Sequence, residues 1–129
     1  EGVGLDYDYR CINAANLIKA KEKLNNINYY LFNLEKEDLG FIKNFFLKEK
    51  VDLCFLLSVC MWIKNWKEVI LFCSKLSSNL IFETNGSHNQ QCNQVEMLEK
   101  LYSSIQVIYA QSFDDQTQHT RTLLFCSNE

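Results

Sequence analysis

The 129-residue chain has four glycines, no proline, no long apolar run and no excess of basic charge. Its longest apolar stretch, 51–63, is interrupted by Asp52 and is shorter than the about 20 residues that cross a bilayer. The 13 basic residues are scattered among 16 acidic ones, and the net charge of −3 disfavours a nucleic-acid partner. With no membrane segment and no signal peptide, we expect a cytoplasmic protein. The absence of proline does not discriminate between functions.

Metal-ligand spacing is also missing from the sequence. None of the six cysteines forms a Cys-x-x-Cys pair, and His88 and His119 are not grouped with them, so we expect no metal site. Most of the cysteines lie inside apolar runs, which is typical of reduced thiols that pack as small hydrophobic side chains.

What the chain does contain is an alternation of strand-like and helix-like segments. The composition, 47% hydrophobic and 22% charged, fits one globular domain over residues 1–129. Hydrophobic patterning predicts strands at 2–8, 27–34, 51–58, 79–84, 105–110 and 121–127, and helices at 11–25, 35–50, 65–76 and 95–103, with a loop at 85–89. This order predicts an α/β fold: a three-layer sandwich around a mostly parallel, doubly wound sheet with an antiparallel pair at the C-terminus. The continuous apolar run at 51–58 predicts a strand covered on both faces.

A carboxylate ends the first predicted strand, at Asp6. Holding a carboxylate at the tip of a buried strand is costly unless it accepts strong hydrogen bonds, and the two hydroxyls of a ribose supply them. Asp6 therefore predicts a site for a nucleoside-bearing cofactor, although Asp8 lies close enough to share the role.

Five segments in this order resemble motifs of the class I, Rossmann-like S-adenosylmethionine-dependent methyltransferases: four strand ends and, last, the hairpin that closes the sheet. They are Val3-Gly4-Leu5-Asp6, Phe32-Asn33-Leu34, the apolar run at 51–59, Phe82-Glu83-Thr84-Asn85 and the tail that ends in Arg121-Thr122-Leu123-Leu124-Phe125-Cys126. The resemblance begins at the second strand of that family and implies S-adenosylmethionine as cofactor.

Two departures from the family pattern stand out. The family's first strand and Gly-rich turn are absent, and the four glycines cannot supply that turn elsewhere. Without this central strand two apolar strand edges would lie unpaired. We therefore expect a domain that is incomplete at its N-terminus and binds the cofactor poorly alone. Asn33 also replaces the usual Asp, which keeps hydrogen bonding but removes a charge.

The resemblance implies five cofactor contacts. Asp6 would hold the ribose, Tyr7 the adenine face, and Asn33 the adenine edge. The backbone amide of Leu34 would line the adenine pocket, and Ser58 would face the reaction cleft at the end of its strand. Four of them have a structural alternative: a solvated turn residue for Asp6, half-buried packing for Tyr7, and capping of the following helix for Asn33 and Ser58.

Three residues are candidates for contact with the methyl acceptor. Trp62, with Met61 and Trp66, would form an aromatic wall or else belong to the core. Glu83 would act as a base or orient the substrate, unless its role is that of a structural hydrogen-bond acceptor. His88 has the pKa range of a general base, although a lone loop histidine is usually a bystander. We expect Arg121 to pair with Asp114 or Asp115.

The resulting prediction is methyl transfer to a small-molecule acceptor, with no catalytic residue assigned. Transfer from a sulfonium needs mainly proximity and alignment, which agrees with the lack of an obvious catalytic dyad. A nicotinamide-dependent oxidoreductase, whose second strand also ends in an acidic residue, and a degenerate domain kept as an interaction module are the alternatives.

Overall fold

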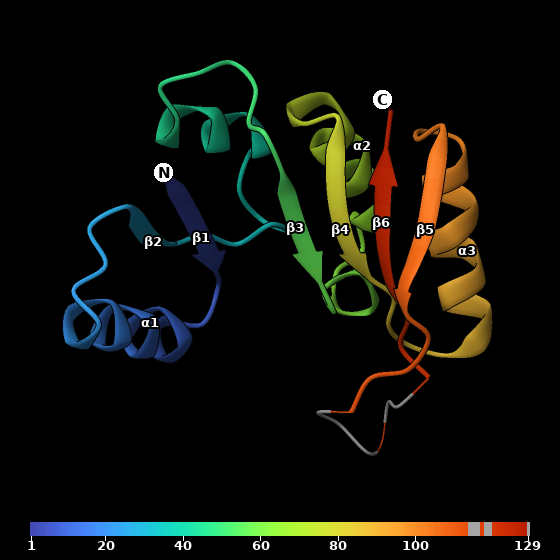
Figure 1. The fold of residues 1–129 in the computed structure, drawn as a ribbon, viewed down its shortest axis with the longest axis horizontal. Coiled ribbons are helices and arrows are strands. Elements are labelled where there is room, and N and C mark those ends of the chain that lie inside the picture. Colours follow the sequence, from blue (N-terminus) through green and yellow to red (C-terminus); the bar gives the residue numbers. More distant parts are fainter. Residues whose placement is uncertain (114–116, 118–119, 129) are drawn as a thin grey trace. The chain divides into compact units, whose positions relative to one another are not determined.

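The computed structural model describes residues 1–113, 117 and 120–128 and divides the chain into two compact units, Glu1–Phe45 and Phe46–Glu129. Each unit is described on its own (Figure 1). The elements are β1 (Gly2–Asp6), α1 (Tyr9–Lys21), β2 (Ile27–Leu31), the 3₁₀ helix η1 (Leu39–Phe45), β3 (Cys54–Leu57), the 3₁₀ helix η2 (Cys60–Trp62), α2 (Trp66–Leu76), β4 (Asn79–Glu83), α3 (His88–Glu99), β5 (Ser104–Tyr109) and β6 (Leu123–Ser127). Among these described residues, no helix has the length and apolar character needed to cross a membrane.

The first unit is a strand–helix–strand element. β1 and β2 pair in parallel, from Gly2 opposite Ile27 to Asp6 opposite Leu31, and α1 connects them. The Tyr30 and Phe45 rings stack with centroids 4.4 Å apart, and Phe32 meets Phe45 edge-on at 6.3 Å. These aromatic contacts fasten the end of η1 to β2.

Glycine at position 4 follows from the pairing of β1 with β2. Gly4 lies opposite Tyr29, and a Cβ atom added there would come within 2.5 Å of the tyrosine ring. The close approach of the ring to the β1 backbone therefore requires a residue without a side chain.

The predicted helix over 35–50 is wrong. The structure has a turn followed by the short η1. Asn33 Oδ1 accepts from the backbone N–H groups of Glu35 and Lys36, and Asp38 Oδ1 accepts from that of Gly40. Such side-chain bonds compete with the i→i−4 ladder, and Gly40 weakens a helix further, so the apolar spacing is not sufficient here.

The second unit contains a four-stranded sheet in the order β3-β4-β6-β5. β3 and β4 are parallel, whereas β6 runs antiparallel to both of its neighbours. The α/β class, the parallel pairs and the antiparallel C-terminal strand are as predicted. The two last strands do pair, but β6 lies between β4 and β5 rather than at the sheet edge.

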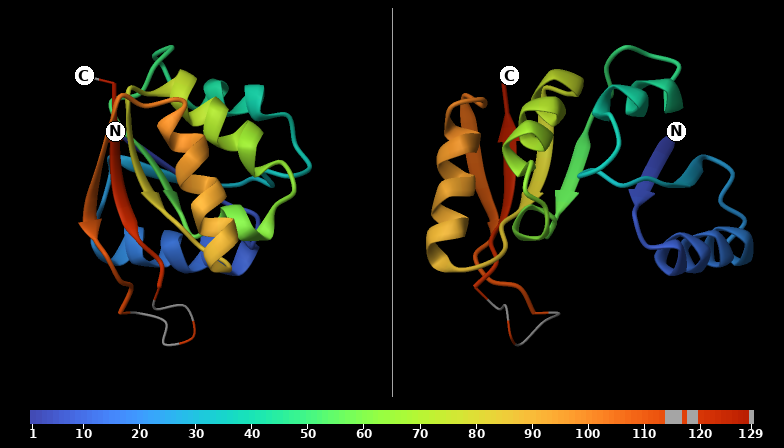
Figure 2. Two further views of the ribbon diagram at one scale, coloured as in Figure 1. Left: turned by 90° about the vertical axis from the view of Figure 1, so that its right-hand side faces the viewer. Right: turned by 180° about the vertical axis from the view of Figure 1, so that it is seen from behind.

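Helices α2 and α3 pack on one face of this sheet (Figure 2). The side chains between them and the sheet form the core of the unit, and several are fully buried. They include Ile70 on α2, Leu98 on α3, Leu80 and Phe82 on β4, and Cys126 on β6.

The prediction that the strand within 51–58 is covered on both faces is wrong for the structure. On β3, Leu56 is buried, but Phe55 and Leu57 are 65% and 47% exposed. Successive side chains of a strand point to opposite faces, and within the second unit α2 and α3 cover the face of Leu56, whereas Phe55 and Leu57 lie on the other face.

Helix α3 begins seven residues earlier than predicted, so the last two residues of the expected loop at 85–89 belong to the helix. Ser87 caps α3: its hydroxyl accepts from the backbone N–H of Gln90, whose side chain accepts in return from the backbone N–H of Ser87. This capping box starts the helix at His88 within a polar stretch, where hydrophobic periodicity carries no information.

We expect Phe82→Ala to lower the free energy of unfolding by about 3–5 kcal/mol, because Phe82 is fully buried under the helices. Phe55→Ala, on the neighbouring strand and the uncovered face, should lower it by less than about 1 kcal/mol. Urea denaturation followed by circular dichroism measures both. Equal losses would show that the second face is covered.

Candidate functional site

The carboxyl ends of the parallel strands β3 and β4 meet at one edge of the second unit. Leu57 pairs with Glu83, so Ser58, one residue further along, lies beside the end of β4. The backbone N–H of Ser58 points to the carbonyl of Glu83 at 3.4 Å, and its hydroxyl donates to Glu83 Oε2. The structure thus joins two of the predicted site residues. Ligands of open α/β sheets bind at this edge.

Arg121 completes a buried polar network with these two residues. It precedes β6, and the pairing of Leu123 with Glu83 brings it to the same sheet edge. Its Nη1 donates to Ser58 Oγ at 2.7 Å and lies 3.6 Å from Glu83 Oε2, while Nη2 donates to Ser112 Oγ at 2.8 Å. Because the Arg121 and Glu83 side chains are only 8% and 19% exposed, their charges offset one another largely out of water.

Ser58 adopts a left-handed backbone conformation, with φ at +54°. A non-glycine residue with positive φ is uncommon and is held by its surroundings. Here the Ser58 hydroxyl is bonded to both Glu83 and Arg121. The network therefore fixes the point at which the chain leaves β3 and enters η2.

The chain beyond β4 is held by α3. The Gln94 side-chain amide bonds the backbone of Asn85 twice, accepting from its N–H at 3.1 Å and donating to its carbonyl at 2.9 Å. Asn85 Oδ1 in turn accepts from the backbone N–H of Met61 at 3.0 Å. η2 is thereby connected through Asn85 to α3.

A second buried amide fixes the start of β6. Gln91 Oε1 accepts from the Thr84 hydroxyl at 2.6 Å, and its Nε2 donates to the Gly86 carbonyl and to Thr120 Oγ1. The Thr84 hydroxyl also accepts from the backbone N–H of Thr122 at 2.8 Å. This set of bonds explains why polar Gln91 is buried at a helix face.

In the first unit, Asp6 ends β1 as predicted. Its Oδ1 accepts from the backbone N–H of Asp8 at 2.8 Å, and no described residue bonds Oδ2. Asp8 is committed to α1, because its side chain accepts from the N–H of Arg10 and pairs with the guanidinium at 2.6 Å. Arg10 holds the pKa of Asp8 below its usual value. Of the two carboxylates, Asp6 is the one with acceptor capacity to spare.

Asn33 and Tyr7 show different environments in the same unit. Asn33 Oδ1 caps the turn after β2 rather than a following helix, and its backbone N–H donates to Glu37 Oε2 at 2.5 Å. The Asn33 Nδ2 group has no bond to a described residue. Tyr7 is 72% exposed and does not pack as a half-buried side chain. Leu34 follows Asn33 in the turn.

The remaining candidates lie on the second unit. Trp62, on η2, is 68% exposed, so its assignment to the core is wrong. His88 opens α3 rather than lying in a loop, and its Nε2 lies 3.6 Å from the Sγ of Cys92, one turn further along. Among the described residues, no three His, Cys, Asp or Glu side chains come together as a metal site.

Sequence reasoning missed the role of Arg121. The expected partners Asp114 and Asp115, and likewise His119, lie outside the described residues, whereas Ser58, Glu83 and Ser112 are its partners within them. A correct register of β6 against β4 would have shown that Arg121 lies close to Ser58 and Glu83. The buried amides of Gln91 and Gln94 gave no sequence signal, because both read as polar positions of a surface helix.

Comparisons with known proteins identify the fold. No protein-family model matches the sequence, and no curated protein matches it. Among solved structures, the N-terminal domain of EvdMO1, with SAH (S-adenosylhomocysteine) bound, superposes with a TM-score of 0.74 at 9% identity. The match covers 98% of this chain and 64% of that domain.

Two further solved structures also match the fold of this chain. The bifunctional kinase-methyltransferase WbdD matches with a TM-score of 0.69 at 16% identity, over 98% of this chain and 29% of WbdD. The METTL16 MTase domain matches with a TM-score of 0.69 at 15% identity, over 98% of this chain and half of that one. The chain therefore has the α/β fold of S-adenosylmethionine-dependent methyltransferases, as the resemblance implied, and spans less than two thirds of the length of these matches.

We expect Arg121→Leu to lower the free energy of unfolding by about 1.5–3 kcal/mol, because it removes charge-assisted bonds and leaves Glu83 without its cation. Arg10→Leu, which breaks the exposed pair with Asp8, is the matched control and should have a much smaller effect. Urea denaturation of both variants tests the difference. Losses of equal size would contradict a stabilising role for the buried network.

Stability should also fall at alkaline pH. Burial raises the pKa of the Cys60 thiol from 9.0 to about 12. Between those values the unfolded chain loses a proton that the folded chain keeps, so the free energy of unfolding declines as pH rises. We expect a loss of about 1 kcal/mol from this thiol between pH 8 and pH 10.

Urea midpoints at the two pH values measure this effect. The difference should shrink in Cys60→Ala and stay unchanged in Cys11→Ala, which alters an exposed cysteine. An undiminished difference in Cys60→Ala would show that Cys60 titrates normally.

Proposed function

We propose that this chain carries the cofactor and acceptor residues of an S-adenosylmethionine-dependent methyltransferase that acts on a small molecule. The observation that most supports this proposal is the match of 98% of the chain to a domain with SAH bound, at a TM-score of 0.74. The free Oδ2 of Asp6 at the carboxyl end of β1 suits a ribose hydroxyl, which supports the cofactor. Tyr7, Asn33 and Leu34 are the proposed adenine contacts, and Ser58 the contact nearest the reaction.

The cofactor would supply a methyl group on a positively charged sulfur, which is already a good leaving group. Held by Asp6, Tyr7, Asn33 and Leu34, the cofactor would supply this methyl group to the acceptor atom, and the electron pair of the broken carbon–sulfur bond would stay on sulfur. The chain's own residues would hold the two reactants in line, which is where most of the rate acceleration arises. Glu83 Oε1, not bonded to a described residue, would accept the hydrogen of an acceptor hydroxyl or amine.

Trp62 and His88 are proposed for the outer part of the acceptor site. Both are exposed, and they follow the carboxyl ends of β3 and β4 through η2 and the capped start of α3. The acidic net charge of −3 supports a small-molecule acceptor rather than a nucleic acid. A small molecule of this kind accompanies one of the matching structures, because the N-terminal domain of EvdMO1 was crystallised in the presence of SAH and D-fucose.

We further propose that an additional strand completes the sheet. Among the described residues, β1 pairs only with β2 and β3 only with β4, so each has an unpaired edge. Unpaired edges with apolar side chains such as Phe55 favour pairing with a further strand. Such a strand would belong to a longer polypeptide containing this chain.

Calorimetric titration of S-adenosylmethionine tests both parts of the proposal. We expect saturable binding by a longer polypeptide that carries the additional strand and weak or no binding by residues 1–129 alone. Tight binding by residues 1–129 would overturn the need for another strand. Failure of the longer polypeptide to bind would overturn the cofactor assignment, and preferential binding of NAD⁺ would favour an oxidoreductase.

We expect Asp6→Asn in the longer polypeptide to weaken S-adenosylmethionine binding at least about tenfold, because the ribose loses a charged acceptor. Asp8→Asn is the matched control: asparagine also caps helices, so affinity should be unchanged. Equal affinities for the two variants would remove Asp6 from the site.

A further inference from the structure

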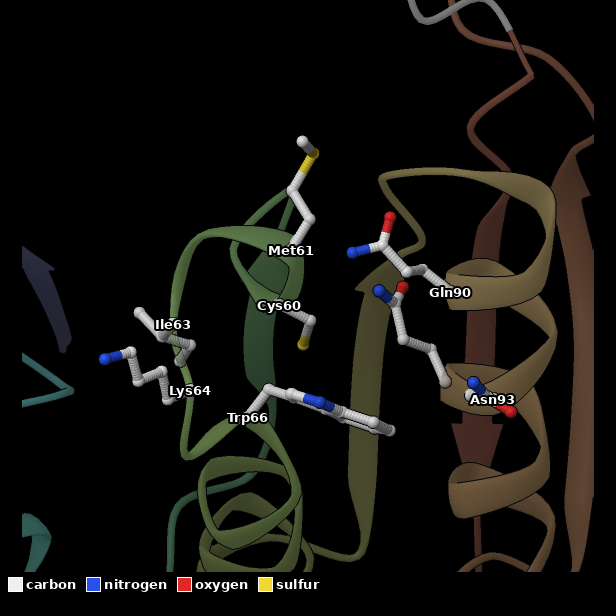
Figure 3. Close-up of a pocket in the computed structure, with 8 residues that line it drawn as sticks. Cys60, Met61, Ile63, Lys64, Trp66, Gln90 and Asn93 are labelled. Carbon is white, nitrogen blue, oxygen red and sulfur yellow. The ribbon is translucent and has the colours of Figure 1, made fainter.

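A cavity of about 310 Å³ lies between η2, the start of α2 and the first turns of α3 (Figure 3). We name it the Trp66 pocket; its walls include Cys60, Met61, Lys64, Trp66, Gln90 and Asn93. Its volume falls within the range of small-molecule sites. η2 and α3, which line the pocket, follow the carboxyl ends of β3 and β4, and ligands of open α/β sheets bind beyond these strand ends.

One wall of the Trp66 pocket is apolar. The Trp66 ring extends from the start of α2 toward α3 (Figure 3), and Met61 and Cys60 come from η2. Burial raises the pKa of the Cys60 thiol to about 12, so it is neutral at physiological pH. The indole ring is half-buried, and the Lys67 ammonium lies 5.4 Å from its centroid, which leaves the other ring face for the C–H face of a ring-shaped ligand.

The opposite wall carries side-chain amides. Gln90 and Asn93 are three residues apart on α3 and so share a helix face. The Ser87 capping bond holds Gln90 Oε1, and the Gln90 side chain extends from α3 toward Met61 (Figure 3). Neither the Gln90 Nε2 group nor the Asn93 amide is bonded to a described residue. Together they offer donors and one acceptor for hydroxyl groups.

The charged groups that line the pocket limit the charge of a ligand that can bind there. Of the described residues, those that line the pocket include no carboxylate, and Lys64 is the charged one among them. A cationic ligand would lie near the ammonium group of Lys64, and the two like charges would repel one another. A neutral, hydroxylated ligand would use both the aromatic and the amide wall.

We infer that the Trp66 pocket binds a neutral sugar ring, stacked on Trp66 and hydrogen-bonded by its hydroxyls to Gln90 and Asn93. Naming this sugar as the methyl acceptor rests on the proposed function. Sugar binding itself does not, and it can be measured with no cofactor present. The inference names a substrate class for the site and the two amides that select it.

Trp62 does not line the pocket, so Trp62→Phe keeps the pocket walls and leaves Trp66 as the single tryptophan, whose fluorescence then reports on the pocket. We expect D-galactose to change this fluorescence saturably. D-galactosamine, which places an ammonium on the same ring, should bind about fivefold more weakly. Adenosine serves as a flat heteroaromatic comparison. Absence of a saturable change with D-galactose, or tighter binding of D-galactosamine or adenosine, would overturn the inference.

A pair of asparagines on α3 provides the mutational test in the same single-tryptophan background. Asn93→Ala should weaken D-galactose binding about fivefold through the lost hydrogen bond. Asn89→Ala alters an exposed asparagine of the same helix outside the pocket and should leave affinity unchanged. Equal affinities in the two variants would overturn the inference. Calorimetry with S-adenosylmethionine tests the proposed function separately. A failure of sugar binding can therefore be told from a failure of cofactor binding.

Discussion

The antiparallel pairing of β6 with β4 is the interaction on which the second unit depends. It inserts the last strand beside the parallel pair, and through residues such as Leu124 and Cys126 it completes the layer under α2 and α3. Because β6 runs opposite to β4, its first residues lie where β4 ends. Arg121 reaches Ser58 and Glu83 for this reason, although 63 residues separate it from Ser58 in the sequence. One strand pairing thus builds both the core and the polar edge.

The fold was predictable from the sequence wherever a hydrophobic pattern was continuous. The apolar run before Ser58 and the one before Glu83 indicated the two strands, and the order of the elements indicated the α/β class. The patterns were misleading where side-chain hydrogen bonds decide the backbone. Asn33 and Asp38 replace most of a helix by a turn, and Ser87 starts a helix in a stretch that has the composition of a loop.

The candidate site was predictable only in part, for the same physical reason. Ser58 and Glu83 could be placed because a strand end fixes where its last residues lie. Their hydrogen bond to one another and the arrival of Arg121 depend on register across long sequence separations. Gln94 is the clearest example of a contact that the sequence does not indicate. Its side-chain amide makes the two hydrogen bonds to the Asn85 backbone that a neighbouring strand would otherwise make. A buried glutamine of this kind has the sequence pattern of an exposed one.

The unpaired edge of β3 has a consequence for handling the isolated chain. Its four residues, Cys54–Leu57, contain none of the lysines, prolines or bulges with which natural sheets discourage self-association, and Phe55 is exposed beside an unused row of backbone groups. A second molecule could add its own strand there, so concentrated solutions should aggregate. Lysine at position 55 would act as a gatekeeper without disturbing the buried face.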